Sequence, residues 1–177
     1  MKIISGKYKG KKIKGFDIEG TRPTMDRVKE SLFAMIQSKL KESKVLDLFT
    51  GSGNLGLESF SNGASFVTFV DKNKKAIQIV KQNIKELNIT EKYELVISDY
   101  MNFLKNQTQK YGIIFLDPPY KANLLEKAVS LILENNLLEE DGIIVCEYEN
   151  IKLELSDLII WKERKYGTKM ITIYKKK

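Results

Sequence analysis

Apolar runs and amphipathic stretches alternate along the chain from residue 44 onwards. The apolar runs are short and rich in β-branched and aromatic residues, which is typical of strands. They are Val45–Phe49, Phe66–Val70, Tyr93–Ile97, Gly112–Leu116 and Gly142–Cys146. The intervening stretches have helical spacing of their apolar residues: Gly53–Phe60, Lys74–Leu87, Met101–Lys105 and Leu124–Leu133. This alternation predicts an α/β fold with a mostly parallel sheet and helices on both faces.

Two β-rich runs near the end of the chain break this alternation. Leu158–Lys165 and Lys169–Tyr174 are separated only by Tyr166-Gly167-Thr168. A link this short cannot carry a crossover helix, so the two runs are expected to form an antiparallel hairpin. A nucleotide-binding dehydrogenase domain would more often continue with parallel units or a second domain.

Residues 1–42 have a different pattern and are expected to form an extension of the catalytic core at 43–177, within one domain. Short β-like pieces around Ile3–Ile4 and Lys11–Lys14, with glycines between them, predict a small hairpin. A helix should follow in TRPTMDRVKESLFAMIQSKL, with Thr24 as its N-cap. Its expected apolar stripe consists of Val28, Leu32, Ala34, Met35 and Ile36.

Composition excludes several classes of protein. No apolar run approaches the roughly 20 residues of a membrane helix, and Met1 is followed by lysines without the apolar segment of a secretory signal. The single cysteine, Cys146, fits a reducing cytoplasm and a buried core position. Histidine is absent, which removes Ser–His–Asp hydrolysis and most zinc chemistry. We expect a cytoplasmic protein without a metal site.

Positive charge is concentrated at the start of the chain. The net charge is +7, and the first sixteen residues contain lysines but no acid. The expected hairpin contains Lys7, Lys9, Lys11 and Lys12. A basic arm of this kind is a candidate contact for nucleic acid. The alternative is a solvated surface in a protein rich in lysine.

A glycine-rich loop follows the first core strand and opens a helix. In DLFTGSGNLGLE, Gly51, Gly53 and Gly56 match G-x-G-x-x-G, which lets a ligand approach backbone N–H groups at a helix N-terminus. Asp71 ends the next strand, where a carboxylate can bind ribose hydroxyls. The constellation indicates a nucleoside-containing ligand without choosing between NAD and S-adenosylmethionine. The alternative is glycines that only pack helix against strand, and a solvated Asp71.

Two further acids bear on the choice of ligand. Asp47, at the strand end before the glycines, would repel a pyrophosphate but suits an ammonium group such as that of S-adenosylmethionine. Asp99 ends the third strand, where it can accept the adenine amine or serve as an ordinary helix N-cap.

The segment FLDPPYK at residues 115–121 ends an apolar strand with an acid, two prolines and an aromatic ring. The lone pair of a nucleobase amine is delocalised into the ring, so methyl transfer to it requires acceptors that aim the nitrogen. The Asp117 carboxylate and the Pro118 carbonyl can be those acceptors, held rigid by Pro118 and Pro119. Tyr120 can stack on an extruded base. The alternative is a rigid turn with a packing tyrosine.

The Asp-Pro-Pro-Tyr motif resembles that of amino-directed nucleic-acid methyltransferases. KIISGKYKGKKI, TRPTMDRVKESLF, DLFTGSGNLGLE, FLDPPY and KYGTKMITIY extend this likeness over essentially the whole chain. In this order they resemble the RsmD family of bacterial 16S ribosomal RNA guanine-N2 methyltransferases. The resemblance implies a Rossmann-like class I methyltransferase with a seven-stranded, mostly parallel sheet ending in an antiparallel hairpin. It also implies S-adenosylmethionine as donor and a partly assembled small ribosomal subunit as partner.

The resemblance also implies roles for individual residues. Gly51, Ser52 and Gly53 would line the methionine part of the donor. Asp71 would bind the ribose, and Asp99 with Tyr100 the adenine. Arg22, Pro23 and Thr24 match a motif near the cofactor, and Arg22 either pairs with the methionine carboxylate or makes a surface ion pair.

This sequence departs from the family pattern at a few positions. Asn54 replaces a usual alanine, and Asn62 replaces a frequent arginine, which weakens any inference of RNA contact there. We expect a monomer. The alternatives are an amino-methyltransferase of DNA adenine or another RNA, and a catalytically silent RNA-binding protein.

Overall fold

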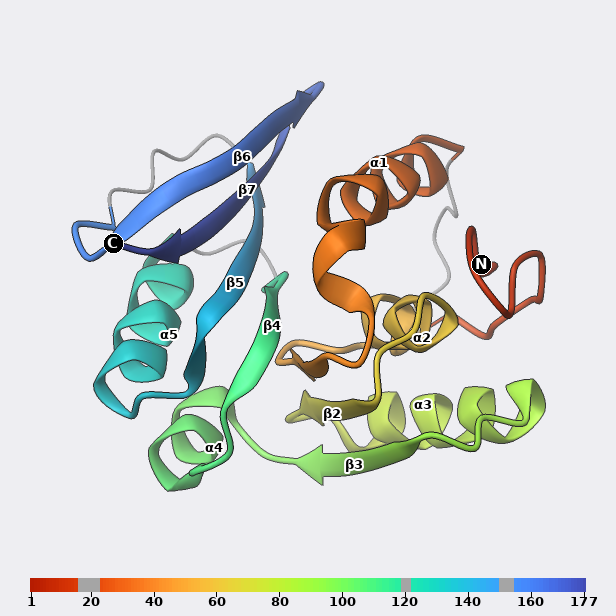
Figure 1. The fold of residues 1–177 in the computed structure, drawn as a ribbon. Helices are drawn as coiled ribbons and strands as arrows, with labels where there is room; N and C mark the ends of the chain where they lie inside the picture. Colours follow the sequence, from red (N-terminus) through yellow and green to blue (C-terminus); the bar gives the residue numbers. More distant parts are fainter. Residues whose placement is uncertain (16–22, 119–121, 150–154) are drawn as a thin grey trace.

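The computed structural model describes residues 1–15, 23–118, 122–149 and 155–177. Its centre is a seven-stranded sheet with the order β3-β2-β1-β4-β5-β7-β6 (Figure 1). The strands are β1 (Lys44–Asp47), β2 (Phe66–Asp71), β3 (Lys92–Ile97), β4 (Tyr111–Leu116), β5 (Leu138–Glu149), β6 (Leu158–Tyr166) and β7 (Lys169–Lys176). Strands β1 to β5 are parallel to one another, and β7 is antiparallel to both β5 and β6. The expected sheet and terminal hairpin are confirmed.

Helices cover both faces of this sheet. They are α1 (Pro23–Leu40), α2 (Asn54–Ser61), α3 (Lys74–Leu87), α4 (Tyr100–Asn106) and α5 (Ala122–Glu134). Apolar residues of α1, α2 and α3 share one core with one face of the sheet, and those of α4 and α5 share a second core with the other face. Cys146 is buried in the second core, as expected, and burial raises the pKa of its thiol.

Helix α1 differs from its prediction at two positions. It begins at Pro23, so Thr24 lies within its first turn and is not its N-cap. Proline is favourable at this first position because it has no N–H that needs a partner. Ala34 is exposed, whereas Phe33 is buried. The buried stripe follows the four-residue spacing of Val28, Leu32, Ile36 and Leu40, which turns Ala34 towards solvent.

The N-terminal segment forms a smaller hairpin than expected. Its two arms are joined by an isolated antiparallel bridge between Lys2 and Lys12. It is anchored by the buried side chains of Ile3, Tyr8 and Ile13, which join the core beneath α1. We call residues 1–15 the arm. Figure 1 shows the arm on one side of α1 and the β6–β7 hairpin on the other.

Within the described ranges, no helix is both long enough and apolar enough to cross a lipid bilayer.

Candidate active site

The candidate site lies along the edge where the parallel strands end. Asp47 and Asp71 are the last residues of β1 and β2, and Asp99 and Asp117 follow closely after β3 and β4. Because β3, β2, β1 and β4 are parallel neighbours, these four carboxylates lie along one edge of the sheet. The chain order reverses between β1 and β4, and ligands of open α/β sheets bind at such a reversal.

The glycine loop connects β1 to α2 at this reversal. Gly51 has φ of 54° and Gly53 has φ of 82°, a left-handed conformation that other residues adopt only with strain. Gly53 precedes α2 directly, so the backbone amides at the start of this helix adjoin the loop. Gly56 has a packing role instead, since a Cβ there would come within 2.3 Å of the Phe69 ring. Both interpretations of the glycines thus have a place in the structure.

Asp47 is buried beneath this loop and ties it to the helix. Its Oδ2 accepts hydrogen bonds from the Thr50 hydroxyl at 2.7 Å and the Gly56 amide at 3.0 Å. Burial raises the pKa of Asp47 to about 6, and these two hydrogen bonds oppose the shift. The remaining oxygen, Oδ1, accepts no hydrogen bond from the described residues. The expected ammonium contact therefore has an acceptor atom available at the loop.

Asp71 and Asp99 both bind backbone amides. Asp71 accepts from the Gly51 amide at 3.0 Å and the Asn73 amide at 2.8 Å, so it stabilises the glycine loop directly. Asp99 accepts from the Asn102 amide at 2.8 Å, so it is the N-cap of α4, as one of its two expected roles required. A carboxylate has about four lone-pair sites, so both acids can also accept ligand hydroxyls or amines.

Tyr100, at the start of α4 after β3, packs against Phe49, which follows β1. Its ring lies 5.5 Å from the Phe49 ring, measured between centroids, with the rings tilted by 48°. Burial, and then the charge of Asp99, raise the pKa of the Tyr100 hydroxyl, which stays neutral and able to donate. The residues expected to contact adenine thus adjoin the loop expected to contact methionine.

Asp117 is exposed beyond the end of β4 and has charged neighbours on two strands. Leu116 pairs with Cys146, so Asp117 lies level with Glu147 of β5. Glu147 accepts a 2.6 Å hydrogen bond from Lys169 of β7. Surrounding protein atoms displace water and raise the pKa of Asp117, Glu147 and Asp47 raise it further, and the Lys169 ammonium opposes them. Because Asp117 is exposed, water moderates this upward shift of its pKa.

Asn83 of α3 is a site residue that the sequence analysis missed. Its side chain is fully buried and donates to the Ser52 carbonyl in the glycine loop at 3.1 Å. It also exchanges two hydrogen bonds with the Lys14 backbone in the arm. The signal was present, because Asn83 occupies the buried stripe of Ala76, Val80 and Leu87, where a polar residue requires a partner.

A buried ion pair between Lys29 and Glu58 was also missed. The two charged groups are 2.9 Å apart, and their side chains are 5% and 0% exposed. Glu58 accepts from the Ile4 and Ser5 amides, and Lys29 donates to the Lys2 carbonyl and to Asn54. The pair thus joins the arm, α1 and α2, and Asn54, a departure from the family pattern, completes it.

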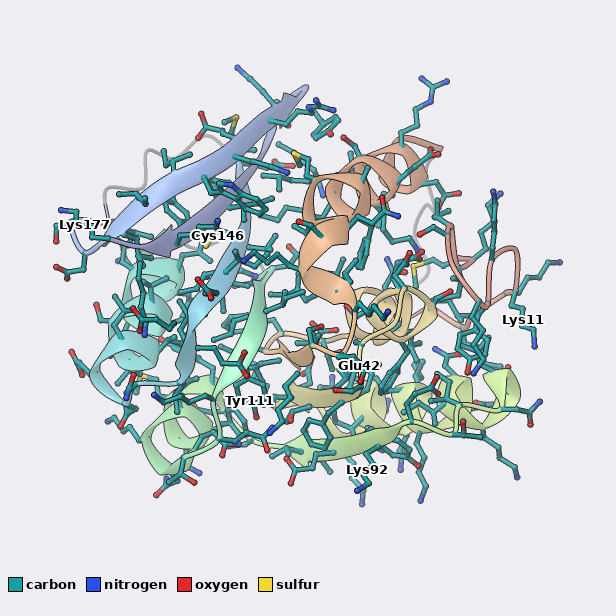
Figure 2. The ribbon with its side chains drawn as sticks, in the orientation of Figure 1. Lys11, Glu42, Lys92, Tyr111, Cys146 and Lys177 are labelled. Carbon is teal, nitrogen blue, oxygen red and sulfur yellow. The ribbon has the colours of Figure 1, made fainter. Side chains whose placement is uncertain are left out.

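The four arm lysines expected to contact RNA are Lys7, Lys9, Lys11 and Lys12, and all four are exposed. Lys7 forms an ion pair with Glu91 at 3.3 Å. Figure 2 shows the Lys11 side chain projecting from the arm. Tyr8 of the arm is buried in the core beneath α1, and its hydroxyl donates to Glu91.

Several expected site residues lie outside the described residues. These are Arg22, Pro119 and Tyr120. The backbone of Thr24 is described as part of α1, but its side chain is not. Their proposed roles stay predictions.

Comparison with known proteins gives consistent matches over the whole chain. The model of the family described as Conserved hypothetical protein 95 matches residues 1–175. A Bacillus subtilis protein named "Putative rRNA methyltransferase YlbH" is 43% identical, covering 100% of both chains. Ribosomal RNA small subunit methyltransferase D of Haemophilus influenzae is 39% identical, covering 86% of this chain and 80% of its own. A solved structure described as "Putative methyltransferase yhhF from Escherichia coli" is 30% identical, with a TM-score of 0.89, covering 100% and 98%.

Proposed function

We propose that this chain methylates the 2-amino group of a guanine in 16S ribosomal RNA. The chain belongs to the family described as Conserved hypothetical protein 95 and is a class I methyltransferase of the RsmD family. The methyl donor is S-adenosylmethionine. Residues 43–177 are the catalytic core and residues 1–42 an extension that contacts RNA. The partner is an assembling small ribosomal subunit in the cytoplasm, and the enzyme acts as a monomer.

One observation carries the proposal: Asp117-Pro118 follows β4, directly beside the β1 strand that leads into the glycine loop. The acceptors for a nucleobase amine and the cofactor loop therefore lie on neighbouring strand ends. Asp117 accepts one N–H of the guanine amine, and the Pro118 carbonyl accepts the other. Both fix the nitrogen lone pair towards the donor methyl, which is orientation and electrostatic preorganisation. Pro119 holds this turn rigid, and Tyr120 stacks on the extruded guanine.

The donor lies across the ends of β1, β2 and β3. Gly51, Ser52 and Gly53 line its methionine part, and the free oxygen of Asp47 accepts from its ammonium. Asp71 binds the ribose hydroxyls, and Asp99 with Tyr100 binds the adenine. Arg22 and Thr24 complete the methionine end. This assignment uses the carboxylates of neighbouring parallel strands in their order along the sheet edge.

The proposal is tested by replacing Asp117 with Ala, which removes the side-chain acceptor. Transfer of labelled methyl to unmethylated small subunits should fall at least about 100-fold, because a transition-state acceptor of this kind contributes about that factor or more. Affinity for S-adenosylmethionine, measured by calorimetry, should change little. Unchanged turnover in this variant would contradict the assigned role of Asp117.

A further inference from the structure

From a cluster of lysines around Trp161, we infer a second RNA-binding surface, distinct from the arm. The cluster lies at the junction of α1 and β6 and consists of Lys39, Lys162 and Lys175. We call it the Trp161 cluster. Its ligand is the phosphodiester backbone of the RNA, bound without base specificity. This inference rests on the proposed function for the identity of the nucleic acid.

The geometry gathers positive charge on one aromatic ring. The ammonium groups of Lys175, Lys162 and Lys39 lie 4.0, 4.2 and 6.0 Å from the centre of the Trp161 indole. Cation–π attraction holds ammonium groups at such distances. The indole itself is only partly buried, packed against the core beneath α1. Because lysines already occupy the ring, it organises cations and is not free to stack on a base.

Among the described residues, no carboxylate forms an ion pair with any of these three lysines. Lys162 donates to the Met35 carbonyl at 2.6 Å, and Lys39 to the Asp141 carbonyl at 3.0 Å, which fixes them without neutralising them. The neighbouring acid Glu163 accepts from Thr172. Three ammonium groups around one ring, without a carboxylate partner among the described residues, attract an anion.

A basic residue beyond the cluster along β6 lies close to the candidate active site. Register places Asp117 level with Glu147, Glu147 opposite Ile171, and Ile171 opposite Arg164. Three strand spacings therefore separate Asp117 from Arg164, about 14 Å. The exposed Arg164 donates to Ser31 of α1, on the same face as Lys162, and continues the positive charge along β6 from the cluster towards the hairpin turn at that edge.

Both basic surfaces lie on the α1 side of the sheet. The arm and Trp161 pack against the same core, and Figure 1 shows α1 between the arm and the β6–β7 hairpin. RNA that crosses α1 can therefore contact the arm, the active-site edge and the Trp161 cluster together. Charge complementarity and this continuity with the proposed RNA path favour an RNA backbone over an acidic protein as the ligand.

The test uses Trp161 as its own reporter, because it is the only tryptophan in the chain. An unmethylated 16S rRNA transcript is titrated into the full-length enzyme while tryptophan fluorescence and RNA affinity are measured at several salt concentrations. The variant is Lys175→Gln, since Lys175 makes no side-chain hydrogen bond or ion pair within the described residues. The matched control is Lys127→Gln, on the exposed surface of α5 across the sheet.

RNA should change Trp161 fluorescence in the wild-type protein. Lys175→Gln should lower RNA affinity about fivefold near 0.1 M salt and reduce the slope of log affinity against log salt by about 0.7 to 0.9, whereas Lys127→Gln should change neither. Adding Lys39→Gln should extend the loss, with thermal unfolding checked for each variant. Unchanged affinity and slope in the doubly substituted protein would overturn the inference. A response to polyglutamate but not to RNA would also overturn it, in favour of a protein partner.

Failure of this inference is distinguishable from failure of the proposed function. If methyl transfer persists but RNA affinity does not depend on Lys175, the RNA-binding role of the Trp161 cluster is rejected and the proposed function is retained. If RNA affinity depends on Lys175 but no RNA is methylated, the RNA-binding role of the Trp161 cluster is retained and the proposed reaction is rejected.

Discussion

At the residue scale, charged neighbours of the candidate catalytic acid decide how it titrates. Asp117 lies level with Glu147, and Glu147 is bound by Lys169 from the next strand. One neighbour disfavours the ionised carboxylate and the other favours it. If ionised Asp117 is the acceptor of the guanine N–H, these two residues set the pH range of catalysis.

The first prediction concerns the pH profile of kcat/KM for methyl transfer. The rate should rise with pH as Asp117 ionises, because its pKa is raised above the ordinary carboxyl range. Glu147→Gln removes a negative neighbour and should move the midpoint to lower pH. Lys169→Gln removes a positive neighbour and should move it to higher pH. Glu140→Gln is the control and should not move the midpoint. Glu140 lies at the start of β5 and forms an ion pair with Lys176 of β7. If the midpoint is the same in wild type, Glu147→Gln and Lys169→Gln, Asp117 is not the group whose ionisation sets the pH profile.

A second prediction concerns Asp47, whose burial favours its protonated form. Its pKa is about 6 in the folded protein, against an ordinary value of 3.8. The folded state therefore binds more protons between these values, so the contribution of Asp47 to stability is greatest below pH 4 and is lost as pH rises through 6. Asp47→Asn does not titrate and keeps an acceptor for Gly56. The free energy of unfolding of wild type, relative to this variant, should fall by about 2 kcal/mol between pH 4 and pH 7.

Urea unfolding at several pH values measures that difference. The assigned shift in the pKa of Asp47 would be contradicted if the free energy of unfolding of wild type, relative to Asp47→Asn, stays constant or increases as pH rises. The same variant should bind S-adenosylmethionine more weakly at pH 7, since it lacks the charge proposed to face the ammonium group.

At the element scale, sequence periodicity predicts the core well because each strand and helix buries a regular set of apolar residues. The bounds of α3 agree with those expected, and the strands differ mainly at their ends. The start of α1 was misjudged because proline and threonine both favour a helix N-terminus and compete for it. Ala34 was misplaced because alanine is compatible with either face of a helix.

The same local reasoning could not identify the partners of buried polar residues. Lys29 and Glu58 are 29 positions apart in the chain, and Glu58 bonds the arm at Ile4 and Ser5, more than 50 positions away. Nothing in a single helical stripe specifies such a partner. The most that the stripe provides is a warning, as at Asn83, that a polar side chain among buried positions requires one.

A third prediction tests this junction. Glu58→Gln leaves the buried ammonium of Lys29 without its counter-ion, so the free energy of unfolding should fall by about 3 to 5 kcal/mol. The matched control is Glu86→Gln, which breaks the exposed pair with Lys14 and should cost about 1 kcal/mol or less. Denaturant unfolding measures both. Equal small losses would mean that the buried pair does not hold the arm, α1 and α2 together.

At the scale of the whole molecule, the chain separates its tasks by position. The parallel strand ends provide acids and glycines along one edge, and the arm attaches to this edge through Asn83 and through the Lys29–Glu58 pair. The net charge of +7 and the exposed arm lysines account for a basic approach surface. The sequence could predict the charge of the arm, but not that the Asn83 side chain would bond both the arm at Lys14 and the glycine loop at Ser52.

A fourth prediction follows for RNA binding by the arm. Replacing Lys9, Lys11 and Lys12 by Gln should flatten the dependence of log affinity on log salt by about 0.7 to 0.9 for each RNA phosphate that these lysines neutralise. Lys105→Gln and Lys127→Gln, exposed on α4 and α5 across the sheet, should leave it unchanged. Filter binding of a 16S rRNA transcript across a salt series measures the slopes. Equal slopes for arm and control variants would place the RNA elsewhere.

The most direct test of the central claim is methyl transfer from labelled S-adenosylmethionine to small ribosomal subunits that lack this methylation, with genomic DNA and bulk tRNA in parallel. We predict label in the 16S rRNA of the subunit, recovered as N2-methylguanosine after digestion, and none in DNA or tRNA. Label in DNA or tRNA would preserve amine methylation at Asp117 but contradict the substrate. If S-adenosylmethionine binds but no nucleic acid becomes labelled, the proposed enzymatic activity is contradicted, and a catalytically silent RNA-binding protein is the alternative that remains.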